Sequence, residues 1–204
     1  TLIQLGILYD QAFGRLEETA LFFRKAADKS SEIHAVGKEI AARTNLAEVL
    51  RKLRRFDEAR KEIRKAIEFK QHSGHAAEPW KTWSILANIE SDDGNSAASA
   101  DANGKAIICY LAYRRDGGEN HDPPGRLCLA VTDRLLAGAS TAAASLLYEH
   151  AALFEPGEFL SFIHALQAIV AGKRDRALAD TPDLNYLMAA EILFLIETLE
   201  KAGK

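Results

Sequence analysis

The side chains best suited to chemistry in this chain of 204 residues are its histidines and a few paired acids. His72 and His75 have the spacing of two zinc ligands, but no second ligand pair follows them, so an exposed loop explains them better. Asp92 and Asp93 precede Gly94 and are typical of a polar turn. The motifs HExxH, GxSxG, GxxxxGKS/T and GxGxxG do not occur. We therefore expect no catalytic site, no metal site and no cofactor.

Composition places limits on the compartment and the partner. Cys109 and Cys128 give no disulfide framework and are typical of small core residues in a reducing cytoplasm. Leu187 to Ile196, the longest strongly apolar stretch, is too short for a membrane-spanning helix, which needs about 20 residues. The chain begins at Thr1, inside the first repeat described below, without a methionine or a secretory leader. These features predict a cytoplasmic protein without a membrane span, and we expect the chain to be a fragment of a longer protein.

A basic segment runs from Arg51 to Lys70, with nine lysines or arginines against four acids. A nucleic-acid interface would carry this sign of charge, although the net charge of −3 gives no overall attraction to nucleic acid. The acids Glu58 and Glu62 stand at helical spacing from neighbours such as Lys65, as on a solvated helix face. The solvated face is the favoured interpretation, and nucleic acid is the less favoured partner.

The elements that must position these residues follow from a pattern that recurs after 40 residues. Small and apolar residues return in register, and an offset third copy occupies the first 26 residues. Copies in register predict stacked structural units rather than a single globule. The members of the pattern are Arg43, Leu46, Ala47, Leu50, Phe56, Ala59, Ile63 and Ala66, followed by Trp83, Leu86, Ala87, Glu90, Ser96, Ser99, Asn103 and Ala106.

Each copy is expected to be a helical hairpin, because its apolar residues fall at steps of three and four on both sides of a polar break. The middle break spans residues 53–58, and Gly14 and Gly94 in the other copies suit a left-handed helix stop. Small residues such as Gly6 and Ala47 let the two helices of a hairpin approach closely. The expected repeats are residues 1–30, 35–71 and 79–113.

Two stretches carry a specific resemblance. Trp83-x2-Leu86-Ala87 in the third copy, and Leu5-Gly6-x2-Tyr9 with Phe23 and Ala26 in the first, resemble the tetratricopeptide repeat. The longer period resembles the extended repeats of kinesin light chains and of large bacterial multi-repeat proteins. The resemblance implies an all-α fold over residues 1–115, a right-handed α-α superhelix of about three helical hairpins. It also implies a protein-binding scaffold that performs no reaction.

The same resemblance implies a concave groove lined by the first helix of each hairpin. Leu46, Ala47 and Leu50 face their own hairpin, which leaves polar side chains at steps of three and four on the other side. Amide groups there can hydrogen-bond a peptide backbone without requiring one sequence. Clamping of a chaperone's C-terminal carboxylate is disfavoured, because isoleucines occupy three of the required positions. The expected groove residues are Asn45, Glu48, Arg51, Lys52, Lys81, Ser84 and Asn88.

Residues 116–204 form a C-terminal helical segment, after a stretch rich in Gly, Asp, Asn and Pro. It is either a decayed fourth repeat with capping helices or an unrelated helical cap. Asp122 and Thr181 each precede a proline and are expected to cap the helices that follow. The helices are predicted at residues 123–137, 140–152, 157–171 and 183–202.

The last predicted helix is apolar on two sides. Leu193 and Phe194 add apolar surface outside the main stripe, so the helix is either covered within the chain or forms a homodimer. Two other functions stay open at this point: a sensor or oligomerisation arm of a larger signalling NTPase or effector protein, and a nucleic-acid-binding helical repeat. The main apolar stripe consists of Leu184, Leu187, Met188, Ile192, Leu195, Ile196 and Leu199.

Overall fold

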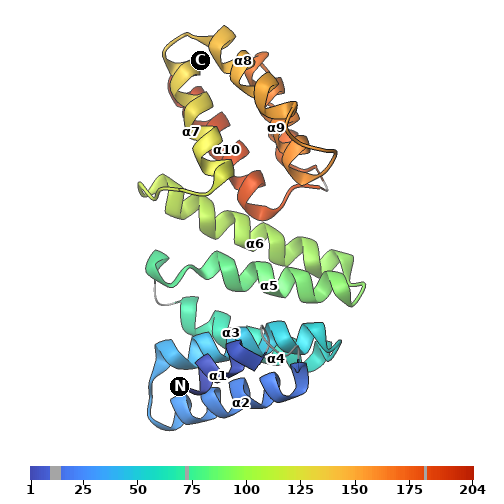
Figure 1. Ribbon diagram of the computed structural model, residues 1–204. Coiled ribbons are helices and arrows are strands. Elements are labelled where there is room, and N and C mark those ends of the chain that lie inside the picture. The colour runs from blue at the N-terminus through green and yellow to red at the C-terminus, as the bar shows by residue number, and fades with distance from the viewer. Residues whose placement is uncertain (10–14, 72–73, 182) are drawn as a thin grey trace. The chain divides into compact units, whose positions relative to one another are not determined.

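The computed structural model describes residues 1–9, 15–71, 74–181 and 183–204 (Figure 1). In these residues the protein is all-α, with ten α-helices packed in sequential antiparallel pairs. The chain divides into two compact units, residues 1–106 and 107–204. The division falls within α6, whereas the sequence placed a boundary at its end. No helix in the described part of the chain is long and apolar enough to cross a membrane.

The first unit consists of successive helices. The helices of each predicted hairpin are present, and the breaks of the second and third hairpins lie where the sequence places them. Contacts join α1 to α2, α2 to α3, α3 to α4 and α4 to α5, and α3 also contacts α5. The elements are α1 (Leu2–Leu8), α2 (Leu16–Glu32), α3 (Val36–Lys52), α4 (Phe56–Gln71), the 3-10 helix η2 (His75–Ala77), α5 (Pro79–Asp92) and α6 (Ser96–Arg115).

The recurring alanines are packing positions of this unit. Ala47 and Ala87 are both buried, as are Ala66 and Ala106. A Cβ atom built on Gly6 would lie 2.6 Å from Cε1 of Phe23, a buried ring, so glycine is required at this approach of α1 to α2. The prediction that small residues permit close helix contact is confirmed for these positions.

Turn geometry follows the same register. Gly94 has a φ of +80°, so the predicted left-handed stop is confirmed there, whereas Gly14 lies outside the described residues. Arg54 stands 40 residues before Gly94 and also has a positive φ, 59°. A non-glycine residue in this conformation costs about 1 kcal/mol, so the fold imposes the turn even where the sequence does not favour it.

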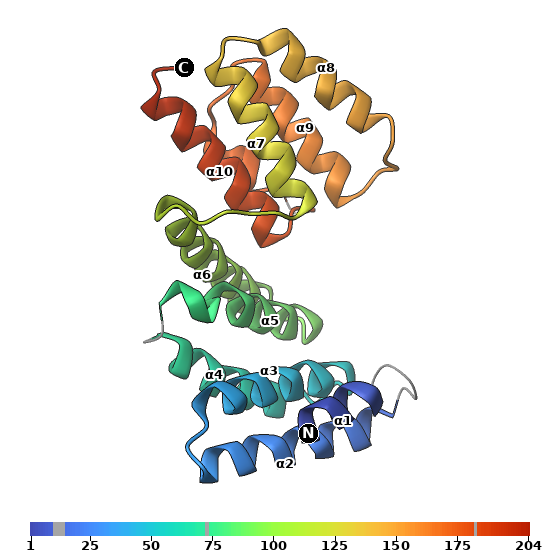
Figure 2. The same ribbon diagram turned by 60° about the vertical axis from the view of Figure 1, so that its left-hand side comes forward.

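The second unit has a core of its own, centred on Phe162, Leu166 and Ile192. In this unit α7 contacts α8, α9 and α10 (Figure 2). The first three predicted helices are confirmed to within one residue at each end. The elements are α7 (Pro123–Leu136), α8 (Ser140–Ala151), α9 (Glu158–Val170), the 3-10 helix η3 (Arg176–Ala179) and α10 (Tyr186–Lys201).

The predicted start of the last helix is wrong. Helix α10 begins at Tyr186, and the side chain of Asn185 accepts hydrogen bonds from the backbone N–H groups of Leu187 and Met188, at 3.0 and 3.1 Å. Thr181 instead donates to the carbonyl of Leu178, and residue 182 lies outside the described residues. An amide side chain at the N-cap satisfies two N–H groups that the helix itself leaves unpaired.

Both apolar sides of α10 are covered within the second unit. Ile192, Leu195 and Ile196 are buried in its core. Phe194 on another side is half-buried, and the guanidinium of Arg114 lies 4.6 Å from its ring centre. Contacts within the chain thereby account for the two-sided apolar pattern, and the homodimer through this helix stays a prediction.

Candidate functional site

The predicted groove residues occupy the accessible sides of α3 and α5, two helices in contact. Apolar residues of both helices, such as Leu50 and Ile89, point into the first unit and are buried. The polar positions between them are left for solvent. Lys52, Lys81 and Asn88 are exposed, and Asn45, Glu48, Arg51 and Ser84 are partly exposed.

Arg51 is the most strongly held member of this set. It bonds Oε2 of Glu48 at 3.1 Å on its own helix and Oδ2 of Asp92 at 2.6 Å at the end of α5. Burial acts against the charged form, yet the hydrogen bond to Asp92 and the charge of Glu48 raise the pKa of Arg51 above its ordinary value. Arg51 and Glu48 therefore fix α3 against α5 and have less capacity left for a ligand.

The amides have more capacity for a ligand. Among the described residues, the side chains of Asn45, Ser84 and Asn88 form no hydrogen bond. Lys81 forms an ion pair with Glu78 at 2.6 Å, and both of these side chains are about half exposed. The two contacting helices thus present three neutral polar groups that can donate or accept hydrogen bonds.

Helix α1 adds apolar surface to the same unit. Ile7 is 38% exposed and Leu8 is 50% exposed. Asp10, which follows this helix in the sequence, lies outside the described residues. Exposed aliphatic side chains of this kind suit contact with the apolar side chains of a protein partner.

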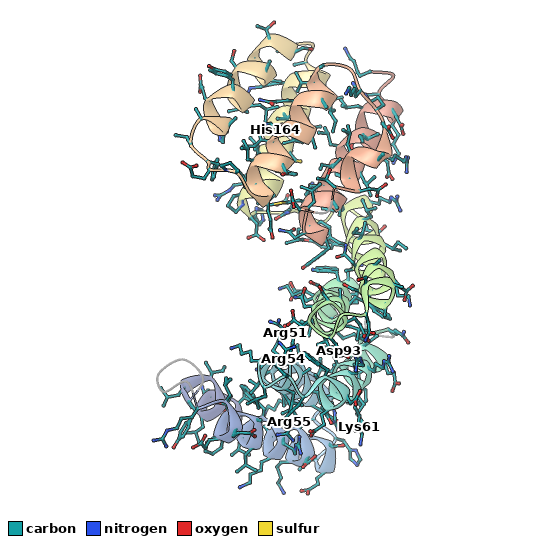
Figure 3. The ribbon with its side chains drawn as sticks, turned by 90° about the vertical axis from the view of Figure 1, so that its right-hand side faces the viewer. Arg51, Arg54, Arg55, Lys61, Asp93 and His164 are labelled. Atoms are coloured by element: carbon teal, nitrogen blue, oxygen red, sulfur yellow. The ribbon has the colours of Figure 1, made fainter. Side chains whose placement is uncertain are left out.

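Most arginines of the basic segment are occupied within the chain. The Nε atom of Arg60 lies 3.0 Å from both carboxylate oxygens of Glu90, and its guanidinium also pairs with Asp93. Figure 3 labels Arg51, Arg55 and Asp93 in the first unit, and Lys61 on α4. Hydrogen bonds to Asp93 and Glu90 raise the pKa of the Arg60 guanidinium above its ordinary value.

The sequence predicted only some of the ion-pair partners of the acids in this segment. Glu58 accepts from Arg24 of α2 at 2.8 Å as well as from Arg55, and Glu62 pairs with Arg43 of α3. These partners lie up to 34 residues away in sequence, so helical spacing within one segment could not identify them. Several charged side chains of this segment therefore form ion pairs with other helices instead of facing only solvent.

Sequence reasoning also missed the role of Glu90. It replaces Leu50 in the repeating pattern and is only 4% exposed. Arg60 satisfies both of its oxygens, and the side-chain amide of Asn95 donates to Oε2 at 3.0 Å. The sequence does contain an indication of this role, because an acid occupies a position that is apolar in the preceding copy. A buried acid requires a cation nearby.

A second buried acid lies in the second unit. Oε1 of Glu191 accepts hydrogen bonds from Tyr110 and Asn120, each at 2.9 Å, and lies 3.2 Å from Nε of Arg114. Oε2 has no hydrogen-bond partner in the described part of the chain. Burial raises the pKa of Tyr110, so the phenol stays protonated and donates. This cluster joins α6 to α10. Because Glu191 is fully buried, a substrate cannot reach its carboxylate.

The histidine pair considered for zinc receives no structural test, because His72 lies outside the described residues. Within the described ranges no group of three or more His, Cys, Asp or Glu side chains could hold a metal ion. Comparisons with protein-family models, curated proteins and solved structures found no match to this chain.

Proposed function

We propose that residues 1–115 form a tetratricopeptide-like right-handed solenoid that binds a peptide or helix of a protein partner across α3 and α5. The main support is a set of amide and hydroxyl groups that form no hydrogen bond with any described residue, on two contacting helices most of whose recurring residues are buried. Positions that the fold does not use are the ones free to recognise a partner.

Each group has a defined part in this proposal. Asn45 and Asn88 can each donate to a peptide carbonyl and accept from a peptide N–H, which recognises backbone rather than sequence. The bond from Arg51 to Asp92 holds the two helices in place before binding, so little ordering is needed when the partner arrives. Lys52 and Lys81 at the exposed edge favour an acidic residue in the partner.

The test uses a peptide selected from a displayed random library by binding to the whole chain. Substituting Asn45→Ala and Asn88→Ala together is expected to weaken that peptide about tenfold or more, since two hydrogen bonds of about 1 kcal/mol each are lost. Fluorescence anisotropy measures the affinity. Helicity and melting temperature should not change, because neither side chain bonds to another described residue.

Lys61→Ala is the control, because Lys61 is exposed on α4 and does not belong to the groove residues of α3 and α5. It should leave the affinity unchanged. If the double substitution has no effect, or if the control weakens binding equally, α3 and α5 are not the binding surface.

Nucleic-acid binding is the second candidate, and the basic segment is its only support. Arg55 pairs with Glu17 and Glu58, and Arg60 is paired as described, so much of this charge is neutralised within the chain. Salt-dependent affinity for DNA or RNA oligonucleotides would favour this candidate over a peptide partner.

A further inference from the structure

A hollow of about 390 Å³ opens between α7, the end of α8 and the start of α9. It lies wholly within the second unit and is separate from α3 and α5. Its walls are mainly apolar, as in sites that take small organic ligands. The apolar residues that shape it are Leu127, Ala130, Leu146, Leu153, Phe154 and Phe159.

The aromatic wall is supported from behind. The ring centres of Phe154 and Phe159 are 4.5 Å apart, and Phe159 lies 5.9 Å from Phe162, which is fully buried in the core. This stacking holds the wall in place without a ligand. At the rim Leu153 is 76% exposed and Phe154 is 42% exposed, so apolar area remains uncovered where the hollow opens.

Among the described residues, the one charged side chain that lines the hollow favours an anion. Arg126 lines it, is exposed, and forms no ion pair with any described residue. His150 also lines it, and its Nδ1 donates to the carbonyl of Leu146 at 2.9 Å, which fixes the ring and leaves Nε2 of the neutral imidazole as a hydrogen-bond acceptor. No carboxylate is among the lining side chains. A guanidinium beside apolar walls is complementary to a carboxylate with an apolar body.

We propose that this hollow binds a small amphipathic monocarboxylate, an acid whose acyl or aryl body fills the apolar walls while its carboxylate meets Arg126. The volume suits a body of roughly eight to twelve carbons. The proposal is independent of peptide binding, because the two surfaces share no residue.

Calorimetric titration of the whole chain with octanoate, octanol and octylammonium tests it. Octanoate should bind about tenfold more tightly than octanol, and octylammonium should bind most weakly. Arg126→Gln changes an exposed side chain, so the fold is kept, and it should lower octanoate affinity to that of octanol while leaving octanol unchanged. Lys173→Gln, an exposed cation outside the hollow, should change nothing.

Ala130→Phe tests the position of the site. Ala130 is half-buried in the wall, and a phenyl ring there should fill the hollow and weaken octanoate and octanol at least tenfold. Circular dichroism checks that the variant folds. Equal affinity for octanoate and octanol in the unchanged chain overturns the proposal, as does octanoate binding that survives both Arg126→Gln and folded Ala130→Phe.

Discussion

A residue of this protein can depart from the apolar repeating pattern where a side chain on another helix forms hydrogen bonds and an ion pair with it. Glu90 stands where the preceding copy has Leu50, and both side chains are buried. Burying a carboxylate costs several kcal/mol unless a cation and hydrogen bonds accompany it, and Arg60 of α4 supplies both. The pair links α4 to α5, so a change of chemistry in one repeat depends on its neighbour.

Removing one partner of this pair should therefore cost more than removing both. Arg60→Met leaves Glu90 buried without its main cation and is expected to lower the free energy of unfolding by about 3 kcal/mol. Arg60→Met combined with Glu90→Leu restores an apolar contact like that of Leu50 and should recover most of the loss. Urea unfolding measures both variants, and a double variant as unstable as the single one would contradict this account.

At the scale of the element, helix boundaries depend on which side chain reaches the free N–H groups. Two dipeptides with proline, at residues 122–123 and 181–182, suggested caps in the sequence. Asp122 precedes α7, but its side chain makes no capping hydrogen bond. The side chain of Asn185, in contrast, does make capping hydrogen bonds at the start of α10. Residue type alone identified candidate N-cap residues, and only the backbone geometry showed which side chain forms the capping hydrogen bonds.

These two positions form a matched pair for mutation. Asn185→Ala removes two hydrogen bonds to the first turn of α10 and should destabilise the protein by about 1 kcal/mol. Asp122→Ala removes no capping bond and should change stability by less than about 0.5 kcal/mol. Thermal unfolding compares the two, and an equal loss would show that Asp122 caps α7 in solution.

On the scale of the whole molecule, the chain contains two compact units, each with its own hydrophobic core. The first is built from neighbouring helix pairs, so its stability is expected to come mainly from contacts between adjacent elements. The second brings together helices that are not consecutive, since α7 contacts α10. Contacts between helices that are distant in sequence therefore contribute to the second unit beside those between neighbours.

Core truncation should reveal these units by hydrogen exchange. Ile63→Ala and Leu166→Ala each remove a fully buried side chain from a different core and should each cost about 3 kcal/mol. We expect faster amide exchange mainly within residues 1–106 for the first variant and within 107–204 for the second. If either substitution accelerates exchange equally throughout, the two units unfold as one.

Most of the helices, two of the hairpin breaks and the small residues at helix contacts could be predicted from the amino-acid order. Helical periodicity is a local property and the 40-residue register is visible in the sequence, which is why Ala47 and Ala87 could be assigned to the core. The tertiary structure decided the polar partners. Arg60 meets Glu90 across 30 residues and Arg51 meets Asp92 across 41, as a result of how helices pack rather than of any sequence period. The hollow beside Arg126 likewise exists only because three helices converge there.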